Sequence, residues 1–275
     1  MTADLPETSS WHGLSHSQGA RWLEYQISPE RRGQHNVAFS FQASQGFDPL
    51  RLELALTALL KAHAALRVEI RDWGGAPMQR PAPIAQASIE VVEAGELSEQ
   101  ELLDLVRVDA RRPFDLTHPP LVRAAIYRAR GRDVLLLVLD HLVADGLSFW
   151  RIVQQLGELL SLSQDDLTKA SEVQEDRSYF DHVKWQREWM TTAAAQEQLL
   201  FWERETSDVV PALHIQRRGR PMSSPEQEWP IRKFFARADV AQAATGIGVS
   251  AFSFLMGCLQ VALFRLSGEP SLTRS

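Results

Sequence analysis

The segment from Asp140 to Gly146 carries the residues best suited to chemistry. It reads Asp-His-Leu-Val-Ala-Asp-Gly, with His141 four positions before Asp145. A histidine changes protonation near neutral pH, so His141 can take a proton from an attacking amine or hydroxyl, or position that nucleophile. We expect Asp145 to fold back into the structure. The alternative is that His141 is a satisfied polar residue at a strand end and Asp145 caps the next helix.

The residues on both sides of this segment predict a strand before it and a helix after it. Val134–Leu139 is apolar at every position, which indicates a strand in the middle of a sheet covered by helices on both faces, although periodicity alone does not exclude a helix. Leu121–Arg128 alternates as the preceding strand, and Gly131–Asp133 marks a hairpin. After Gly146, apolar residues recur at helical spacing. His141 is therefore expected in a loop at a strand end, where functional groups concentrate.

Other elements follow from periodicity, capping residues and turn residues. The sequence predicts a strand over Asn36–Gln42, a helix from Asp48 and Pro49 to near Leu66, a strand over Arg67–Arg71, a turn at Trp73–Gly75, and a helix from the Ser98 and Glu101 capping box to near Arg111. It then predicts a linker over Ser161–Asp176, helical structure over Tyr179–Glu205, a loop over Val209–Glu228, a strand over Ile231–Ala236 and a helix over Ser250–Leu266. This last helix is apolar but too short to span a bilayer, so we expect it to be buried.

The composition is that of an ordinary globular protein. With 275 residues, 44% of them hydrophobic and 23% charged, the chain can bury a full core as one domain or as two lobes. The net charge of −6 comes without a basic block, which argues against a nucleic-acid partner. Cys258 is the single cysteine, which fits a reducing compartment, so we expect the cytoplasm. The sequence predicts no signal peptide in Met1–Ser10 and no membrane segment.

Other histidines and the tryptophans give weaker indications. His63 lies on an apolar helix face and is expected in the core or at an interface. His12, His16, His35, His118, His182 and His214 lack the spacing of metal ligands, so no metal site is predicted. The stripe of Trp185, Trp189 and Trp202 is interpreted as packing rather than as a ligand platform.

Five short motifs, in order along the chain, carry a resemblance. They are Leu14, Ser15, His16, Ser17, Gln18 and Trp22; Ala62, His63, Ala64, Ala65, Leu66 and Arg67; Pro113, Phe114, Asp115, Leu116, Pro120, Leu121, Arg123 and Ala124; His141, Asp145, Gly146 and Ser148; and Tyr179, Asp181 and Trp185. With these motifs the sequence resembles the condensation domains of nonribosomal peptide synthetases, which share a fold with chloramphenicol acetyltransferase-like enzymes. The resemblance implies an α/β (α+β) fold. One lobe, residues 1–175, would hold a mixed sheet covered by helices, and residues 176–275 would form connecting helices and an incomplete second lobe.

The resemblance also implies a reaction and a role for each residue. His141 would assist attack of an acceptor amine or hydroxyl on an acyl thioester held by the phosphopantetheine arm of a carrier protein, so the protein needs no cofactor of its own. Asp145 would be structural and pair with an arginine, for which Arg67 and Arg21 are the candidates in this sequence; the alternative is an arginine in the missing part of the second lobe. Removing one member of such a buried pair costs about 3 to 5 kcal/mol. The other structural residues at the site would be Gly146, Asp140 and Arg67, and the substrate-channel candidates are Ser148, Ser17, Gln18 and Trp22.

The sequence departs from the family pattern at several positions. Asp140 stands where the family has the first histidine of its His-His-x-x-x-Asp-Gly motif, although related acyltransferases need only His-x-x-x-Asp. Ala62 and Ala64 replace an arginine and a glutamate, and Leu147 replaces a tryptophan. The short second lobe implies that much of one wall of the substrate tunnel is absent.

Two other functions remain open at this point. The chain is either a noncatalytic module that docks a carrier protein or a partner chain, with possible self-association through exposed apolar surface, or a free-standing acyltransferase that uses a coenzyme A thioester. Turnover that depends on His141 separates the enzymes from the docking module.

Overall fold

The computed structural model describes residues 11–43, 46–83, 86–129, 132–170, 175–205 and 237–268. The chain forms two compact units, Met1–Ala195 and Gln196–Ser275. The first unit contains all the residues that the sequence nominates for the site. The strand expected over Ile231–Ala236 and the loop expected over Val209–Glu228 lie outside the described residues.

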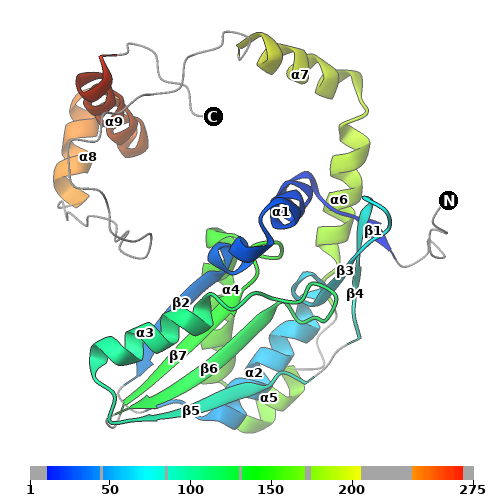
Figure 1. Ribbon diagram of the computed structural model, residues 1–275, viewed down its shortest axis with the longest axis vertical. Coiled ribbons are helices and arrows are strands. Elements are labelled where there is room, and N and C mark those ends of the chain that lie inside the picture. Colours follow the sequence, from blue (N-terminus) through cyan, green and yellow to red (C-terminus); the bar gives the residue numbers. More distant parts are fainter. Residues whose placement is uncertain are drawn as a thin grey trace. The chain divides into compact units, whose positions relative to one another are not determined.

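The main sheet of the first unit has four strands in the order β2-β7-β6-β5 (Figure 1). These strands are β2 (Val37–Ala43), β5 (Ile89–Gly95), β6 (Val122–Ala129) and β7 (Arg132–Leu139). β5 runs parallel to β6, whereas β7 is antiparallel to both of its neighbours, β6 and β2. The sheet is therefore mixed and β7 lies inside it, which confirms the prediction made from its apolar sequence.

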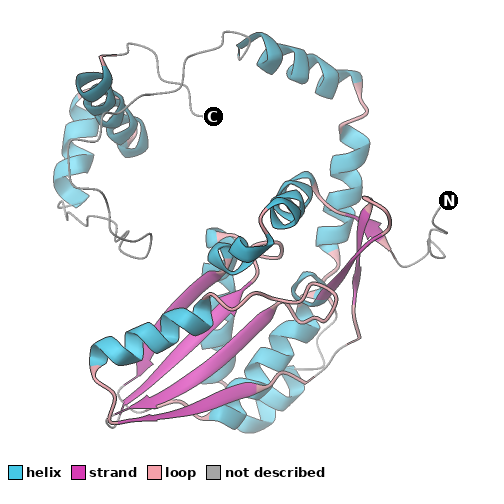
Figure 2. Cartoon of the chain, in the orientation of Figure 1, coloured by secondary structure: helices cyan, strands magenta, loops and turns pink. Residues whose placement is uncertain are grey.

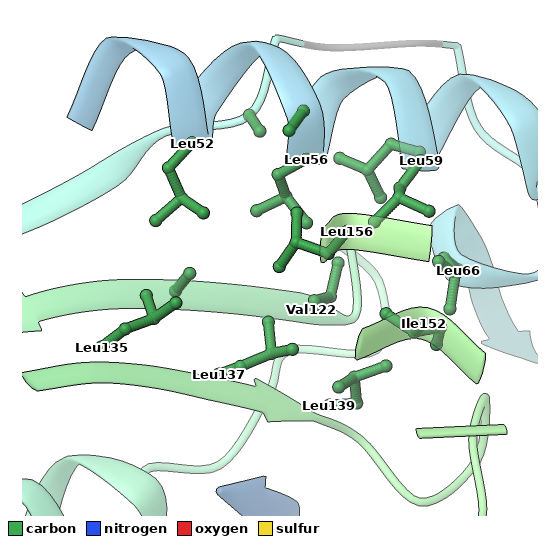
Figure 3. Close-up of a cluster of buried hydrophobic side chains, with 14 of the residues drawn as sticks. Leu52, Leu56, Leu59, Leu66, Val122, Leu135, Leu137, Leu139, Ile152 and Leu156 are labelled. Atoms are coloured by element: carbon green, nitrogen blue, oxygen red, sulfur yellow. The ribbon is translucent and has the colours of Figure 1, made fainter. Parts of the chain in front are cut away.

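Helices cover both faces of this sheet (Figure 2). The helices α2 (Pro49–Ala62), α4 (Gly146–Ser161) and α5 (Gln164–Ala170) pack on one face, and α3 (Glu99–Ala110) packs on the other. Side chains alternate along β7, so Leu135, Leu137 and Leu139 contact the first group (Figure 3), while Leu136 and Val138 face α3. Burying one such side chain fully contributes about 1.5 to 3 kcal/mol. The chain that leaves β7 is thus anchored from both faces.

A smaller sheet in the same unit has the order β1-β4-β3. Its strands are β1 (His12–Gly13), β3 (Val68–Asp72) and β4 (Pro77–Pro81), and the neighbouring segments include α1 (His16–Ile27), α6 (Ser178–Trp189) and two 3-10 helices, η1 (Pro29–His35) and η2 (Ala64–Arg67). An apolar cluster that includes Leu14, Tyr25, Val68, Leu142 and Phe180 joins α1, β3, α6 and the loop after β7. This cluster places α1 beside that loop.

Several helices begin at the capping residues that the sequence indicates. The Asp48 carboxylate accepts hydrogen bonds from the backbone N–H groups of Leu50 and Arg51 at the start of α2. Ser98 and Glu101 form a capping box at the start of α3. Each cap satisfies N–H groups that have no partner within the helix, which is worth about 1 kcal/mol.

Three described strands, β1, β4 and β5, have no counterpart in the sequence-based prediction. β4 begins with Pro77 and ends with Pro81, and proline is depleted in central strands because it cannot donate to a neighbouring strand. Nevertheless, β4 pairs with β1 on one side and β3 on the other. The prolines sit at its ends, so its interior still pairs.

The predicted end of α2 and the predicted linker are both wrong. α2 ends at Ala62 rather than near Leu66, because His63 is extended and the backbone around it pairs with Asp176. The backbone N–H of Asp176 donates to the Ala62 carbonyl at 2.7 Å. The segment expected to be a linker contains α5, whose Leu167 is fully buried in the cluster with α2. It is therefore part of the core.

The helical stretch expected over Tyr179–Glu205 forms two helices, α6 and α7 (Ala193–Glu205). The first unit ends at Ala195, so α6 belongs to it. The lobe boundary near residue 175 stays a prediction. Trp185 and Trp202 are 56% and 61% exposed. Trp185 stacks on Trp189 with 6.4 Å between ring centroids, and Trp202 contacts Phe201 at 5.3 Å. The interpretation of the tryptophan stripe as packing stays a prediction.

The second unit includes α8 (Arg237–Gly246) and α9 (Ala251–Ser267), and Ser250 caps α9 as predicted. The expectation that α9 is buried is wrong, because none of its residues is buried in the described structure. Phe252 alone is 74% exposed. No single described helix is long and apolar enough to cross a membrane, and α8 and α9 pass that test of length and composition only as a pair bent by 85°.

Candidate active site

The loop after β7 forms one wall of a surface pocket of about 250 Å³. The pocket is lined by Ser17, Gln18, Arg21, His141, Leu142, Val143, Ala144, Asp145, Ser148 and Tyr179. The lining residues come from α1, the loop after β7, the start of α4 and the start of α6, which are far apart in the sequence. Larger cavities of about 290 and 350 Å³ lie elsewhere, and neither contains His141.

His141 lies just after β7, and its half-buried side chain faces this pocket. Within the part of the chain that the structure describes, no hydrogen bond or ion pair engages its ring. The alternative that His141 is a satisfied polar residue at a strand end does not fit a ring without such a partner. An imidazole in this position can accept or donate a proton.

The residue before it, Asp140, holds the loop. Its side chain is 1% exposed, and its carboxylate accepts hydrogen bonds from the backbone N–H of Leu142 at 2.8 Å and from the Tyr25 hydroxyl at 3.0 Å. Burial raises the pKa of Asp140, and these two hydrogen bonds act in the opposite direction. Asp140 stands in place of a histidine in the family motif, and its buried carboxylate stabilises the loop through these two hydrogen bonds.

A buried pair of amides holds α1 against the same loop. Gln18 and Gln79 donate to each other's side-chain carbonyls at 3.0 and 2.8 Å, and Gln18 also donates to the Leu142 carbonyl at 3.2 Å. Both glutamines are at most 3% exposed. Gln18 thus acts mainly as a structural tie at the base of the pocket.

Hydroxyl groups line the side of the pocket that α1 and α6 form. The Tyr179 hydroxyl donates to Ser15 Oγ at 3.1 Å, and Ser15 Oγ lies 3.1 Å from Ser17 Oγ. Ser15 also caps α1 by accepting the backbone N–H of Gln18. Polar groups in this arrangement can orient an amide or hydroxyl of a substrate beside His141.

Asp145 is an exposed helix cap at the other side of the pocket. Its carboxylate accepts hydrogen bonds from the backbone N–H and the hydroxyl of Ser148, which lower its pKa. No arginine pairs with it in the described residues. Of the two expected partners, Arg67 pairs with Glu175, and Arg21 pairs with Glu24 at 2.5 Å. The expected ion pair of Asp145 with either arginine is therefore wrong.

Four residues nominated from the sequence do not line the pocket: the buried Asp140, described above, and Arg67, Trp22 and Gly146. Arg67 is 5% exposed and donates to the Leu60 carbonyl at 2.9 Å, away from the site. Trp22 packs against the apolar cluster of α1 and β3. Gly146 is the first residue of α4, and an added Cβ there would meet nothing within 4 Å. Its role as a structural residue stays a prediction.

Sequence reasoning missed two residues that support the site and did not place a third. Gln79 carries a buried polar side chain on an unpredicted strand, and Tyr25 lies on α1 outside the motif. Tyr179 was noted in a motif but not assigned to the pocket. Within the described residues, no group of three or more His, Cys, Asp or Glu side chains is arranged to hold a metal ion.

Comparison with known proteins identifies the family. The family model described as "Condensation domain" matches residues 11–272. The chain belongs to the condensation domain family. Among curated relatives, it is 26% identical over 231 residues to gramicidin S synthase 2 of Brevibacillus brevis, covering 82% of this chain and 5% of that protein. It is also 27% identical over 271 residues to chondramide synthase cmdD of Chondromyces crocatus, covering 94% of this chain and 7% of that protein.

Solved condensation domains confirm the fold. The first condensation domain of the calcium-dependent antibiotic synthetase superposes with a TM-score of 0.75 at 19% identity, covering 96% of this chain and 63% of that one. A condensation domain from the enacyloxin polyketide synthase gives a TM-score of 0.67 at 24% identity, covering 94% and 51%. This condensation-domain chain therefore spans roughly half to two thirds of the length of these structures, and less than a tenth of the two curated relatives. The mixed α/β architecture predicted from the sequence is confirmed.

Proposed function

We propose that this chain takes part in condensation-type acyl transfer, which forms an amide or ester bond from an acyl or aminoacyl thioester bound to a carrier protein in nonribosomal peptide biosynthesis. The observation that supports it is the unpartnered ring of His141 at the wall of a polar pocket. Membership of the condensation domain family supports the reaction class.

In this reaction His141 takes the proton of the acceptor nitrogen or oxygen, or positions that nucleophile, as it attacks the thioester carbonyl. The new C–N or C–O bond forms, the C–S bond breaks, and the pantetheine thiol leaves with a proton. Gln18 and Asp140 would keep the loop in place while Ser17, Ser148 and Tyr179 orient the substrate. The phosphopantetheine arm belongs to the substrate, so the protein needs no cofactor of its own.

The partners in this proposal are acyl or peptidyl carrier protein domains and a small-molecule acceptor. The synthases that match the chain are many times longer than it, which supports an assembly with further domains. Such a system fits the cytoplasm, where the exposed Cys258 stays reduced.

The direct test is turnover with an acyl-loaded carrier protein and an amine, measured by product mass. His141→Ala should abolish product. His118→Ala is the matched control, because His118 is an exposed histidine paired with Asp115 at 2.9 Å, outside the pocket. Equal turnover in the wild type and in His141→Ala would overturn the catalytic role of His141.

A second candidate is a noncatalytic docking module, favoured by the exposed apolar residues of α9. Carrier-protein binding of equal affinity in the wild type and in His141→Ala, with no product from either, would support it. A third candidate, an acyltransferase that uses coenzyme A, is separated in the same assay by supplying acyl-coenzyme A in place of the loaded carrier.

A further inference from the structure

The side chains of Tyr25 and Asp140, the residue before His141, form a buried hydrogen-bonded pair. The Tyr25 hydroxyl donates to Oδ1 of Asp140 at 3.0 Å, and both residues are 1% exposed. The backbone N–H of Leu142 donates to the same oxygen at 2.8 Å. One carboxylate oxygen therefore connects α1 to the residue that follows His141.

The backbone of Asp140 completes the support on the other side. Its N–H donates to the Leu121 carbonyl at 3.0 Å, and its carbonyl accepts the N–H of Val143 at 3.1 Å. Since the His141 ring has no side-chain partner in the described structure, its position depends on the backbone bonds that flank it. Asp140 takes part in three of these hydrogen bonds, with Leu121, Leu142 and Val143.

We propose that Tyr25 is a positioning residue for His141 and acts through the carboxylate of Asp140. The proposal rests on the proposed function where it concerns turnover, but the coupling itself is measurable without substrate. Tyr25 lies on α1, outside every motif found in the sequence.

The charges around Asp140 give this pair a dependence on pH. The groups that face its carboxyl are His141 in the loop, Arg21 and Tyr25 on α1, and Arg123 on β6. Burial raises the pKa of the carboxyl, while the hydrogen bonds from Leu142 and Tyr25 favour its charged form. Tyr25 itself stays neutral, because burial and the nearby Asp140 raise its pKa. Removing its hydroxyl takes away one of two donors, so Asp140 should bind a proton at higher pH.

The first experiment is an NMR titration of the whole chain that follows the Asp140 carboxyl carbon and the His141 ring. In Tyr25→Phe the midpoint of Asp140 should rise by about one to two pH units, the shift expected for a lost hydrogen bond to a charged group. The His141 signals should shift over the same transition. Tyr127→Phe is the matched control, since Tyr127 is also buried and donates to Asp109 at 2.7 Å, away from the loop after β7.

The second experiment follows the acid limb of the pH–rate profile. Tyr25→Phe should move this limb to higher pH and lower kcat with little change in KM, whereas Asp140→Asn should remove the component due to Asp140. In the Asp140→Asn background, Tyr25→Phe should cause no further displacement. A contact that only stabilises the fold would not produce this pattern.

Unchanged Asp140 and His141 titrations in Tyr25→Phe, or equal shifts in Tyr25→Phe and Tyr127→Phe, would overturn the proposal. If no variant shows turnover, the NMR titration still decides it, so its failure is distinct from failure of the proposed function. If Tyr25→Phe does not fold, Asp140→Asn decides it instead: the His141 signals should lose the component that follows the Asp140 carboxyl, and retention of that component would contradict the coupling.

Discussion

Asp145 and Ser148 close the first turn of α4 through two hydrogen bonds to one carboxylate oxygen. The backbone N–H of Ser148 donates at 2.8 Å and its hydroxyl donates at 2.7 Å. Asp145 is exposed, so the aspartate of the family motif is here a helix cap beside the pocket. Substitution of Asp145 should therefore cost the stability of a helix cap and not that of a buried ion pair.

Asp145→Ala should destabilise the chain by about 1 kcal/mol, the usual cost of losing a cap, and not by the 3 to 5 kcal/mol of a broken buried ion pair. Hydrogen bonding lowers the pKa of Asp145, so its contribution is present above the unfolded pKa and is lost as pH falls through the folded value. The difference from wild type in urea unfolding should therefore be present at pH 7 and narrow below about pH 4. Asp48→Ala at the cap of α2 is the control, and a loss at Asp145 several times that at Asp48 would count against a capping role.

Gln18→Ala should destabilise the chain by about 1 to 3 kcal/mol, because it leaves the fully buried Gln79 amide without one partner. Gln18→Ala with Gln79→Ala should cost less than the sum of the two single changes, since each single change strands the other amide. Urea unfolding of the four proteins in this cycle measures the coupling. Strictly additive losses would show that the two amides do not act as a unit.

The central part of the fold was predictable because its signals are local. The two-faced apolar run of β7 and the caps at Asp48 and Ser98 each determine a strand or helix start from neighbouring residues alone. The positions of His141, Asp145 and Ser148 around one pocket followed from the strand–loop–helix pattern together with the family motif.

What could not be predicted depends on contacts between distant segments. α2 ends early because its last residue pairs with Asp176, and α5 forms where Leu167 finds a core site. The expected ion pair between Asp145 and Arg67 rested on the family resemblance alone. In the structure Arg67 forms its ion pair with Glu175 instead. Tyr25 and Asp140 are 115 positions apart, and nothing in the local sequence indicates that they meet.

Asp140→Asn should gain stability relative to wild type as pH rises. The folded pKa of Asp140 is raised by burial, so the folded state holds its proton more tightly than the unfolded state. Such a group contributes its stability below the unfolded pKa of about 3.9, and this contribution is lost as pH rises through the folded value. Asparagine keeps an acceptor for Tyr25 and Leu142 but does not ionise. Urea unfolding at several pH values from 3 to 8 should show this trend, and a constant difference would contradict it.

Phe252→Glu should reduce self-association and apolar dye binding while leaving the free energy of unfolding nearly unchanged. Phe252 is 74% exposed on α9, and Leu255, Leu259 and Leu266, which share its helix face by spacing, are 52%, 37% and 67% exposed. Burying apolar surface away from water is favourable by about 25 cal/mol per Å². Exposed apolar residues on one helix face therefore favour association, and a charged side chain placed among them opposes it.

Val108→Glu on α3 is the matched control, because Val108 is 72% exposed but lies outside this face. The measurements are solution mass and dye fluorescence over a range of protein concentrations. A wild-type chain that stays monomeric and binds no dye, or equal effects of the two substitutions, would show that α9 is not the surface responsible.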